Sequence, residues 1–242
     1  MTRRPAWFAA TLLALLVANG CGSSSKKTAP TTTAAPTTTT SASKPPVAPK
    51  GKLLPGEYAV LVKAARLGKK ADHVKGLRAK QTVLHRECGL LAAAPGTPLM
   101  QAQRRLCGRG VGLVAAVFAF TAQGRECKQA AAAGDISCYA QLFSQLARSA
   151  RSVTASAYEL NAALRRRGLR GRCAKGIGLA SASDLKAAAA IGKSARGASQ
   201  AAYARDEGRF QEAARQLDAS FKDLDSGSNE TELAQLRTCP HS

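Results

Sequence analysis

The chain has 242 residues, of which 36 are basic and 15 acidic, so its formal net charge at pH 7 is +21. Only 5% of the residues are aromatic, and none of the seven cysteines forms a Cys-x-x-Cys pair, which argues against zinc-ribbon and thioredoxin-type sites. A chain of this length has room for one domain with a sizeable core, and its charge favours polyanions as partners.

Residues 1–20 have the order of regions that is typical of an export signal. Arg3 and Arg4 give a charged start, the stretch 7–18 is apolar apart from Thr11, and small residues follow. The apolar stretch is shorter than the roughly 20 residues that span a bilayer. We therefore predict a signal peptide over 1–20 and no permanent membrane helix there.

The next residue raises the question of a lipid anchor. The sequence Val17-Ala18-Asn19-Gly20-Cys21 resembles the lipobox of bacterial prolipoproteins, in which a small residue precedes an invariant cysteine. The resemblance implies acylation of Cys21 and anchoring of the exported chain to the outer face of the cell membrane, although that family favours Leu where this chain has Ala18. Two or more acyl chains anchor a protein stably. Ala18 and Gly20 also fit ordinary signal peptidase, which would release a secreted, unacylated chain.

A low-complexity segment separates the proposed anchor from the domain. Residues 21–51 comprise Cys21 and a linker rich in Thr, Pro and Ser, whose only branched aliphatic residue is Val47. Such a composition has nothing to bury, so we expect a disordered linker. As a flexible coil, residues 22–50 would span about 30 Å.

For residues 52–242 we predict an all-α domain, a bundle of about five or six helices cross-linked by disulfides. Apolar residues recur at alternating intervals of four and three, as on one face of a helix. The clearest such stripe consists of Tyr139, Phe143, Leu146, Ala150, Val153, Ala157, Leu160 and Leu164.

Five further helical segments follow from the same periodicity and from capping signals. They cover 74–91, 97–120, 183–203, 210–224 and 230–238. Thr97-Pro98 is a cap residue followed by proline at the first helical position. The apolar run 113–120 is predicted as a buried helix, Ser183 as a helix N-cap, and Gly208 as the turn before residue 210.

With Cys21 acylated, an even number of cysteines remains, which in an exported chain predicts three disulfides. The six are Cys88, Cys107, Cys127, Cys138, Cys173 and Cys239. Sequence alone does not choose among the pairings, but positions on either side of predicted turns favour 88 with 107 and 127 with 138, which leaves 173 with 239. We expect no metal site, because His85 and Cys88 supply only half of one.

The positive charge is concentrated in residues 52–205, which hold 26 basic and seven acidic residues, whereas 206–242 hold four and eight. Two clusters are candidates for anion binding: Lys69, Lys70 and Lys75, and then Arg165, Arg166, Arg167, Arg170 and Arg172. The alternatives are a solvated charged face and docking of the acidic C-terminal segment on the basic region. We expect no specific nucleic-acid binding, because neither a reading helix nor stacking aromatics are evident.

We expect no enzyme, no catalytic residues and no cofactor. Ser183-Asp184-Leu185-Lys186 matches the S-x-x-K pattern of penicillin-binding proteins, but the S-D-N and K-T-G motifs are missing. The predicted function is a lipid-anchored cell-envelope lipoprotein that is a binding or structural module, with anionic polymers or lipid headgroups as partners. The alternative is a protein–protein interaction module acting through an exposed helical face, or a secreted helical protein without lipid.

Overall fold

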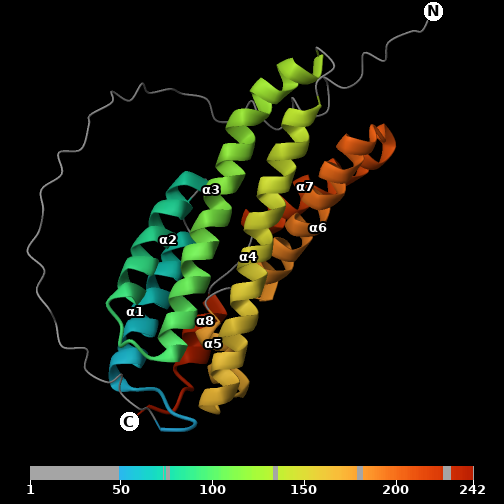
Figure 1. The fold of residues 1–242 in the computed structure, drawn as a ribbon. Helices are drawn as coiled ribbons and strands as arrows, with labels where there is room; N and C mark the ends of the chain where they lie inside the picture. Colours follow the sequence, from blue (N-terminus) through green and yellow to red (C-terminus); the bar gives the residue numbers. More distant parts are fainter. Residues whose placement is uncertain are drawn as a thin grey trace, which may run out of the picture. The chain divides into compact units, whose positions relative to one another are not determined.

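The computed structural model describes residues 49–72, 74, 77–132, 136–178, 182–225 and 230–241, which all lie within one compact unit. These residues form eight α-helices (Figure 1) and, apart from one parallel bridge between Leu53 and His241, no β-structure. The helices are α1 (Pro55–Asp72), α2 (Leu77–Ala92), α3 (Pro98–Ala132), α4 (Ser137–Arg167), α5 (Gly171–Ile177), α6 (Ala182–Ala204), α7 (Glu207–Asp225) and α8 (Glu230–Leu236). The predicted all-α bundle is confirmed. The predicted signal peptide, Cys21 and the linker up to residue 48 lie outside the described residues.

The long helices pack mostly on their neighbours in sequence. The pairs α3–α4, α4–α6 and α6–α7 form the largest contacts, while α1 packs on α2, and α2 packs on α3 (Figure 1). The two short helices α5 and α8 pack together, and α8 also contacts α1. The C-terminal segment is thereby brought to the start of the domain.

The stripe predicted on α4 is the centre of the bundle. All eight of its residues are buried, because α4 lies between α3 on one side and α6 on the other. On the α6 side the packing depends on small residues: a Cβ on Gly192 would lie 3.3 Å from that of Ala150. The Ser199 hydroxyl donates a hydrogen bond of 3.0 Å to the carbonyl of Ala140 across the same interface.

Aromatic side chains from three helices meet within the core. Phe143 is only 1% exposed, and its ring centroid lies 5.0 Å from that of Phe120 and 5.5 Å from that of Phe210. Tyr139 packs edge-on against Phe210, with 6.2 Å between centroids. In an Ala-rich chain these few large rings supply much of the apolar area that folding buries.

Several local predictions need correction. Helices α1 and α5 were not predicted, and the second helix begins at Leu77, not Val74. The turn before α7 was predicted at Gly208, but Gly208 is inside the first turn of α7. The turn itself lies at Arg205, which has a φ of 54°. Asp206 makes this turn possible, since its carboxylate accepts the backbone N–H of Arg209 at 3.0 Å and so caps the helix. Ser183 was predicted as the N-cap of a helix, but it is the second residue of α6, which begins at Ala182.

The three disulfides have the pairing that turn positions favoured. Cys88–Cys107 joins α2 to α3, Cys127–Cys138 joins α3 to α4, and Cys173–Cys239 joins α5 to the C-terminal segment. Because Cys88 is bonded to Cys107, its sulfur is not free to act as a thiolate ligand beside His85. Among the described residues, no group of three or more His, Cys, Asp or Glu side chains is arranged to hold a metal ion.

By length and composition alone, one of the described helices is apolar enough to cross a membrane: residues 98–130 within α3. The core helix of a soluble protein satisfies the same criteria. Here 28% of the most apolar 18-residue window is buried inside the domain. The run 113–120 is helical, as predicted, but it is only partly buried: Leu113, Val114, Val117 and Phe120 face the core, whereas Ala115 is exposed.

Candidate functional site

A buried carboxylate organises one end of the bundle. Glu57, in the first turn of α1, is completely buried. One of its oxygens accepts the backbone N–H of Leu54 at 2.8 Å and Nη2 of Arg167 at 2.9 Å. The other accepts the hydroxyl of Thr97 at 2.5 Å. Arg167, predicted as an anion-binding candidate, is therefore held in an internal ion pair, with its side chain only 12% exposed.

Local sequence explains why a carboxylate is stable at this position. Pro55 starts α1, and Glu57 lies at the third helical position, from which it reaches back to the N–H of the capping residue. Thr97 is the capping residue of α3, and its hydroxyl oxygen accepts the N–H of Met100 at 3.3 Å. Two helix N-termini favour the negative charge, and the C-terminus of α4 favours the positive charge of Arg167.

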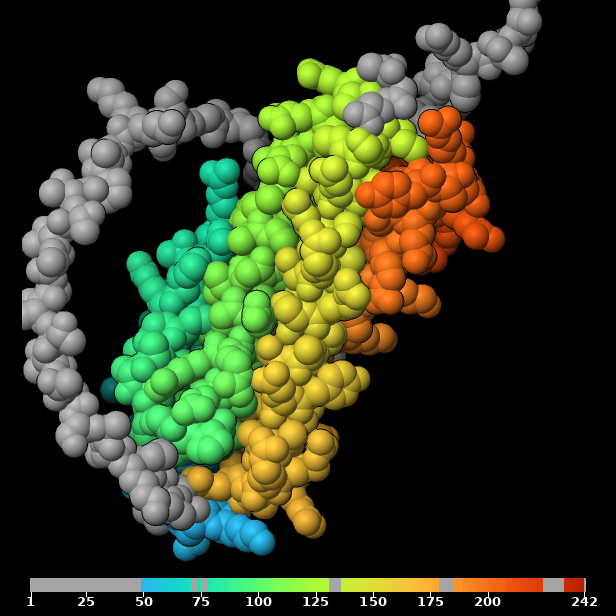
Figure 2. All heavy atoms as spheres, in the orientation of Figure 1, coloured from blue at the N-terminus to red at the C-terminus, as the bar shows by residue number. Residues whose placement is uncertain are grey.

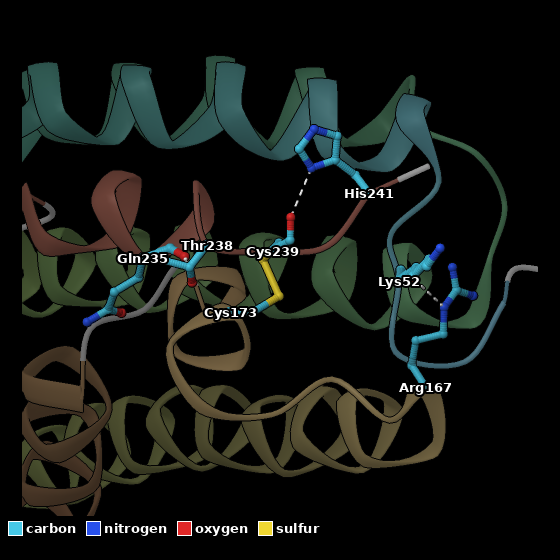
Figure 3. The surroundings of a disulfide bond; sticks show 7 residues. All are labelled: Lys52, Arg167, Cys173, Gln235, Thr238, Cys239 and His241. Carbon is cyan, nitrogen blue, oxygen red and sulfur yellow. Dashed lines mark hydrogen bonds between the residues drawn. A yellow bond between two sulfur atoms is a disulfide. The ribbon is translucent and has the colours of Figure 1, made fainter.

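The two ends of the domain meet beside this network (Figure 3). Gly51 donates its N–H to the carbonyl of Arg167 at 2.7 Å, and Leu53 donates to that of Pro240 at 2.9 Å. Arg167 also donates from Nε to the carbonyl of Lys52 at 3.0 Å. The ring of His241 stacks on Tyr58 with 3.9 Å between centroids. The end of the linker is thus fixed to α4 and to the C-terminal segment.

The segments that meet here share one electrostatic property. Residues 49–56, 161–178 and 233–241 contain no Asp or Glu. Their exposed basic side chains are Lys50, Lys52, Arg165, Arg166, Arg170, Arg172, Lys175 and Arg237. We call this set the basic end. Figure 2 shows the first residues of the domain, in blue, and the end of α4, in gold, exposed together on it.

An open cavity of about 580 Å³ lies within the basic end. It is lined by Gly51, Gly168, Leu169, Arg170, Arg172, Cys173, Thr238 and Pro240. The disulfide from Cys173 to Cys239 joins two of its walls (Figure 3). Two of the predicted anion-binding residues, Arg170 and Arg172, therefore line one concave surface.

The other predicted cluster is separate from the basic end. Lys69 and Lys70 lie in the last turn of α1, and Lys70 follows Glu57 by 13 residues, which is about 20 Å along a helix. Lys70 is exposed and Lys69 is partly buried. Lys75 lies outside the described residues. The two predicted clusters therefore do not form one continuous site.

Besides Lys175, which follows the predicted arginine cluster closely, sequence reasoning missed three members of the basic end: Lys50, Lys52 and Arg237. They come from segments far from α4 in sequence, and only the folded chain brings them together. Searches of protein families, characterised proteins and solved structures found no match to this chain. The interpretation of the basic end therefore depends on its own geometry and charge.

Proposed function

We propose that the chain is a lipid-anchored cell-envelope lipoprotein whose helical domain binds anionic envelope components. The observation that carries this proposal is the basic end, where eight exposed basic side chains lie on segments without a single carboxylate side chain. A concentrated positive potential of this kind attracts polyanions. Outside a cell membrane these are anionic lipid headgroups and anionic wall polymers.

The position of the linker supports the same function. The last linker residues, at Pro49 to Gly51, join the domain at the basic end. A chain anchored through Cys21 would therefore hold this end, and not the α3–α4 turn, nearest to its point of attachment. Because the binding partner and the anchor lie on the same side, tethering raises the effective concentration of one for the other.

The binding test uses isolated cell envelopes and the exported Cys21→Ser chain, which has no acyl anchor. We expect binding that falls steeply with salt and weakens when Arg165 and Arg166 are both changed to Ala. Arg167 is left intact because its loss would disturb Glu57. The matched control changes Lys193 and Arg196, exposed on α6, and should bind like the parent. Binding that ignores salt and both pairs of changes would contradict the proposal.

The anchor has its own test. We expect the chain extracted from membranes to carry acyl mass on Cys21, and to gain six hydrogens when its three disulfides are reduced. An unmodified Cys21 would make the protein a secreted one. The binding proposal would then stand without the membrane anchor.

A second candidate function is suggested by α3. Residues 110–124 contain no charged side chain, and four of them are exposed: Gly112, Ala115, Ala122 and Gln123. Such a face suits a protein partner better than a polyanion. This function predicts a stoichiometric, salt-tolerant complex that Ala115→Glu abolishes and that the change of Arg165 and Arg166 to Ala leaves intact.

A further inference from the structure

The donor groups of the cavity at the basic end define what it can bind. The N–H groups of Gly51, Gly168 and Leu169 are already bonded to carbonyls of α4, and the Thr238 hydroxyl donates to the carbonyl of Gln235 at 2.7 Å. The charged donors among the lining residues are the guanidinium groups of Arg170 and Arg172. Their planar forks match the oxygens of phosphate, each able to bind two.

The arginine residues next to the cavity differ in whether their charge is already paired. Arg167 is neutralised by the buried Glu57, whereas Arg170 and Arg172 are exposed and their segment, 161–178, has no acidic residue. A volume of about 580 Å³ falls within the roughly 300–1,000 Å³ of small-molecule sites. It is larger than a bare phosphate needs and has room for the polar group esterified to one.

The walls of the cavity are held in place before any ligand arrives. Gly168 has a φ of 75°, which ends α4, and its N–H is bonded to the carbonyl of Arg165 at 3.0 Å. The Cys173–Cys239 disulfide and the bond from Leu53 to the carbonyl of Pro240 fix the opposite wall. A pre-organised site loses little conformational entropy on binding, so a small ligand group is sufficient.

We propose that this cavity receives the phosphate of an anionic phospholipid headgroup, so that the domain docks by its basic end on the membrane that carries its anchor. The inference rests on the proposed function and assigns its partner. Gly51 lines the cavity, so the linker leaves the domain at the docking surface itself. With a tether spanning about 30 Å, the effective concentration of the membrane is high, and weak binding per headgroup is enough.

The test compares vesicles of phosphatidylglycerol mixed with phosphatidylcholine against vesicles of phosphatidylcholine alone, using the exported Cys21→Ser chain. We expect binding to the anionic vesicles only. The decisive variant keeps the charge: Arg170→Lys with Arg172→Lys should weaken binding about tenfold, which corresponds to about one charge-assisted hydrogen bond. The matched control, Arg165→Lys with Arg166→Lys, removes two exposed guanidinium groups outside the cavity and should bind like the parent. Circular dichroism and thermal unfolding verify that both variants are folded.

The other outcomes are equally informative. Equal affinity of the two lysine variants for anionic vesicles would overturn the assignment of the headgroup phosphate to the cavity. Binding by diffuse electrostatic attraction, and with it the proposed function, would remain. Binding of soluble glycerol phosphate as tight as that of vesicles would assign the cavity to a free phosphate ester and overturn the membrane assignment. No preference for anionic vesicles, together with salt-dependent binding to isolated envelopes, would overturn the inference and retain an anionic wall polymer as the partner.

Discussion

Glu57 is the residue on which three helix ends converge, and its removal should be costly. Glu57→Ala leaves Arg167 largely buried without its counter-ion and the Thr97 hydroxyl without its acceptor. Breaking a buried pair from one side costs about 3–5 kcal/mol. We expect a fall of this size in the free energy of unfolding, measured by urea denaturation with the disulfides intact.

The chain offers a matched control for that measurement. Glu159 forms an ion pair with Arg105 at 2.9 Å, but both side chains are 54% exposed. An exposed pair contributes about 0–1 kcal/mol, so Glu159→Ala should barely change the stability. Similar costs for the two substitutions would mean that Glu57 is not the organising residue described above.

Tyr139 provides a pH-dependent test of the core. Burial raises the pKa of its phenol above the ordinary value of 10.0, and the hydroxyl donates to the carbonyl of Gly124 at 3.2 Å. A raised pKa in the folded state means that the contribution of Tyr139 to stability is complete below about pH 10 and is lost as the pH rises through the folded value.

We therefore expect the phenolate absorbance of the parent, minus that of Tyr139→Phe, to develop above about pH 10. The parent should also lose stability more steeply than the variant in that range. A difference spectrum whose midpoint lies at or below about pH 10 would show that this phenol is solvated.

At the scale of single residues, some contacts could be predicted from the sequence and others could not. The three disulfides followed from where cysteines lie relative to turns, because a turn fixes which residues of two helices oppose each other. The bond between Glu57 and Arg167 joins residues 110 positions apart, and no local pattern indicates it. Arg167 therefore looked like its exposed neighbours Arg165 and Arg166.

At the scale of helices, the sharpest constraint is the contact between α5 and α8. A Cβ on Gly176 would lie 2.6 Å from the backbone nitrogen of Leu236 and 2.9 Å from the carbonyl carbon of Gln235. Neither atom can move unless α8 moves. Gly176→Ala should therefore lower the unfolding temperature and loosen residues 230–241, as measured by hydrogen exchange.

Gly89 provides the control for the contact between α5 and α8 at Gly176. It is exposed on α2, and a Cβ added to it would have no neighbouring atom within 4 Å. Alanine is favoured over glycine in a helix interior by about 0.5–1 kcal/mol, so Gly89→Ala should raise stability. A stabilising effect of Gly176→Ala as well would contradict the close approach of α5 and α8.

Helices with long apolar stripes were the ones that sequence predicted well. The stripe on α4 repeats over eight positions, and a period maintained that long is specific to a helix. Helix α5 has only seven residues, too few to be stable alone, and it is held by α8 and by the Cys173–Cys239 bond. The turn at Arg205 was misplaced because glycine is the usual residue at positive φ, whereas here an Asp206 cap fixes the turn.

For the molecule as a whole, sequence established that the charge was positive but not where it would gather. The basic end combines residues from the end of the linker, from the α4–α5 region and from the C-terminal segment. Two of these three segments hold only one or two basic residues each and showed no cluster in sequence. Their convergence depends on long-range contacts such as the bond from Leu53 to Pro240.

The disulfides should differ in how much they stabilise the folded chain. Cys173 and Cys239 are separated by 66 residues, and Cys127 and Cys138 by only 11. If a disulfide stabilises mainly by restricting the unfolded chain, the longer loop contributes about 4 kcal/mol and the shorter about 3 kcal/mol. Replacing both cysteines of a pair with alanine should therefore cost more at Cys173 and Cys239, as measured by urea denaturation.

Removal of the two disulfides should also have different effects on proteolysis of the C-terminal segment and on binding to anionic vesicles. The bond at Cys239 holds a wall of the cavity at the basic end, whereas that at Cys127 joins the far ends of α3 and α4. Loss of the first pair should expose residues 237–241 to carboxypeptidase and weaken binding to anionic vesicles at temperatures where the bundle is still folded. Loss of the second should leave both unchanged. Equal costs and equal proteolysis would mean that the C-terminal segment is held mainly by α8 and not by its disulfide.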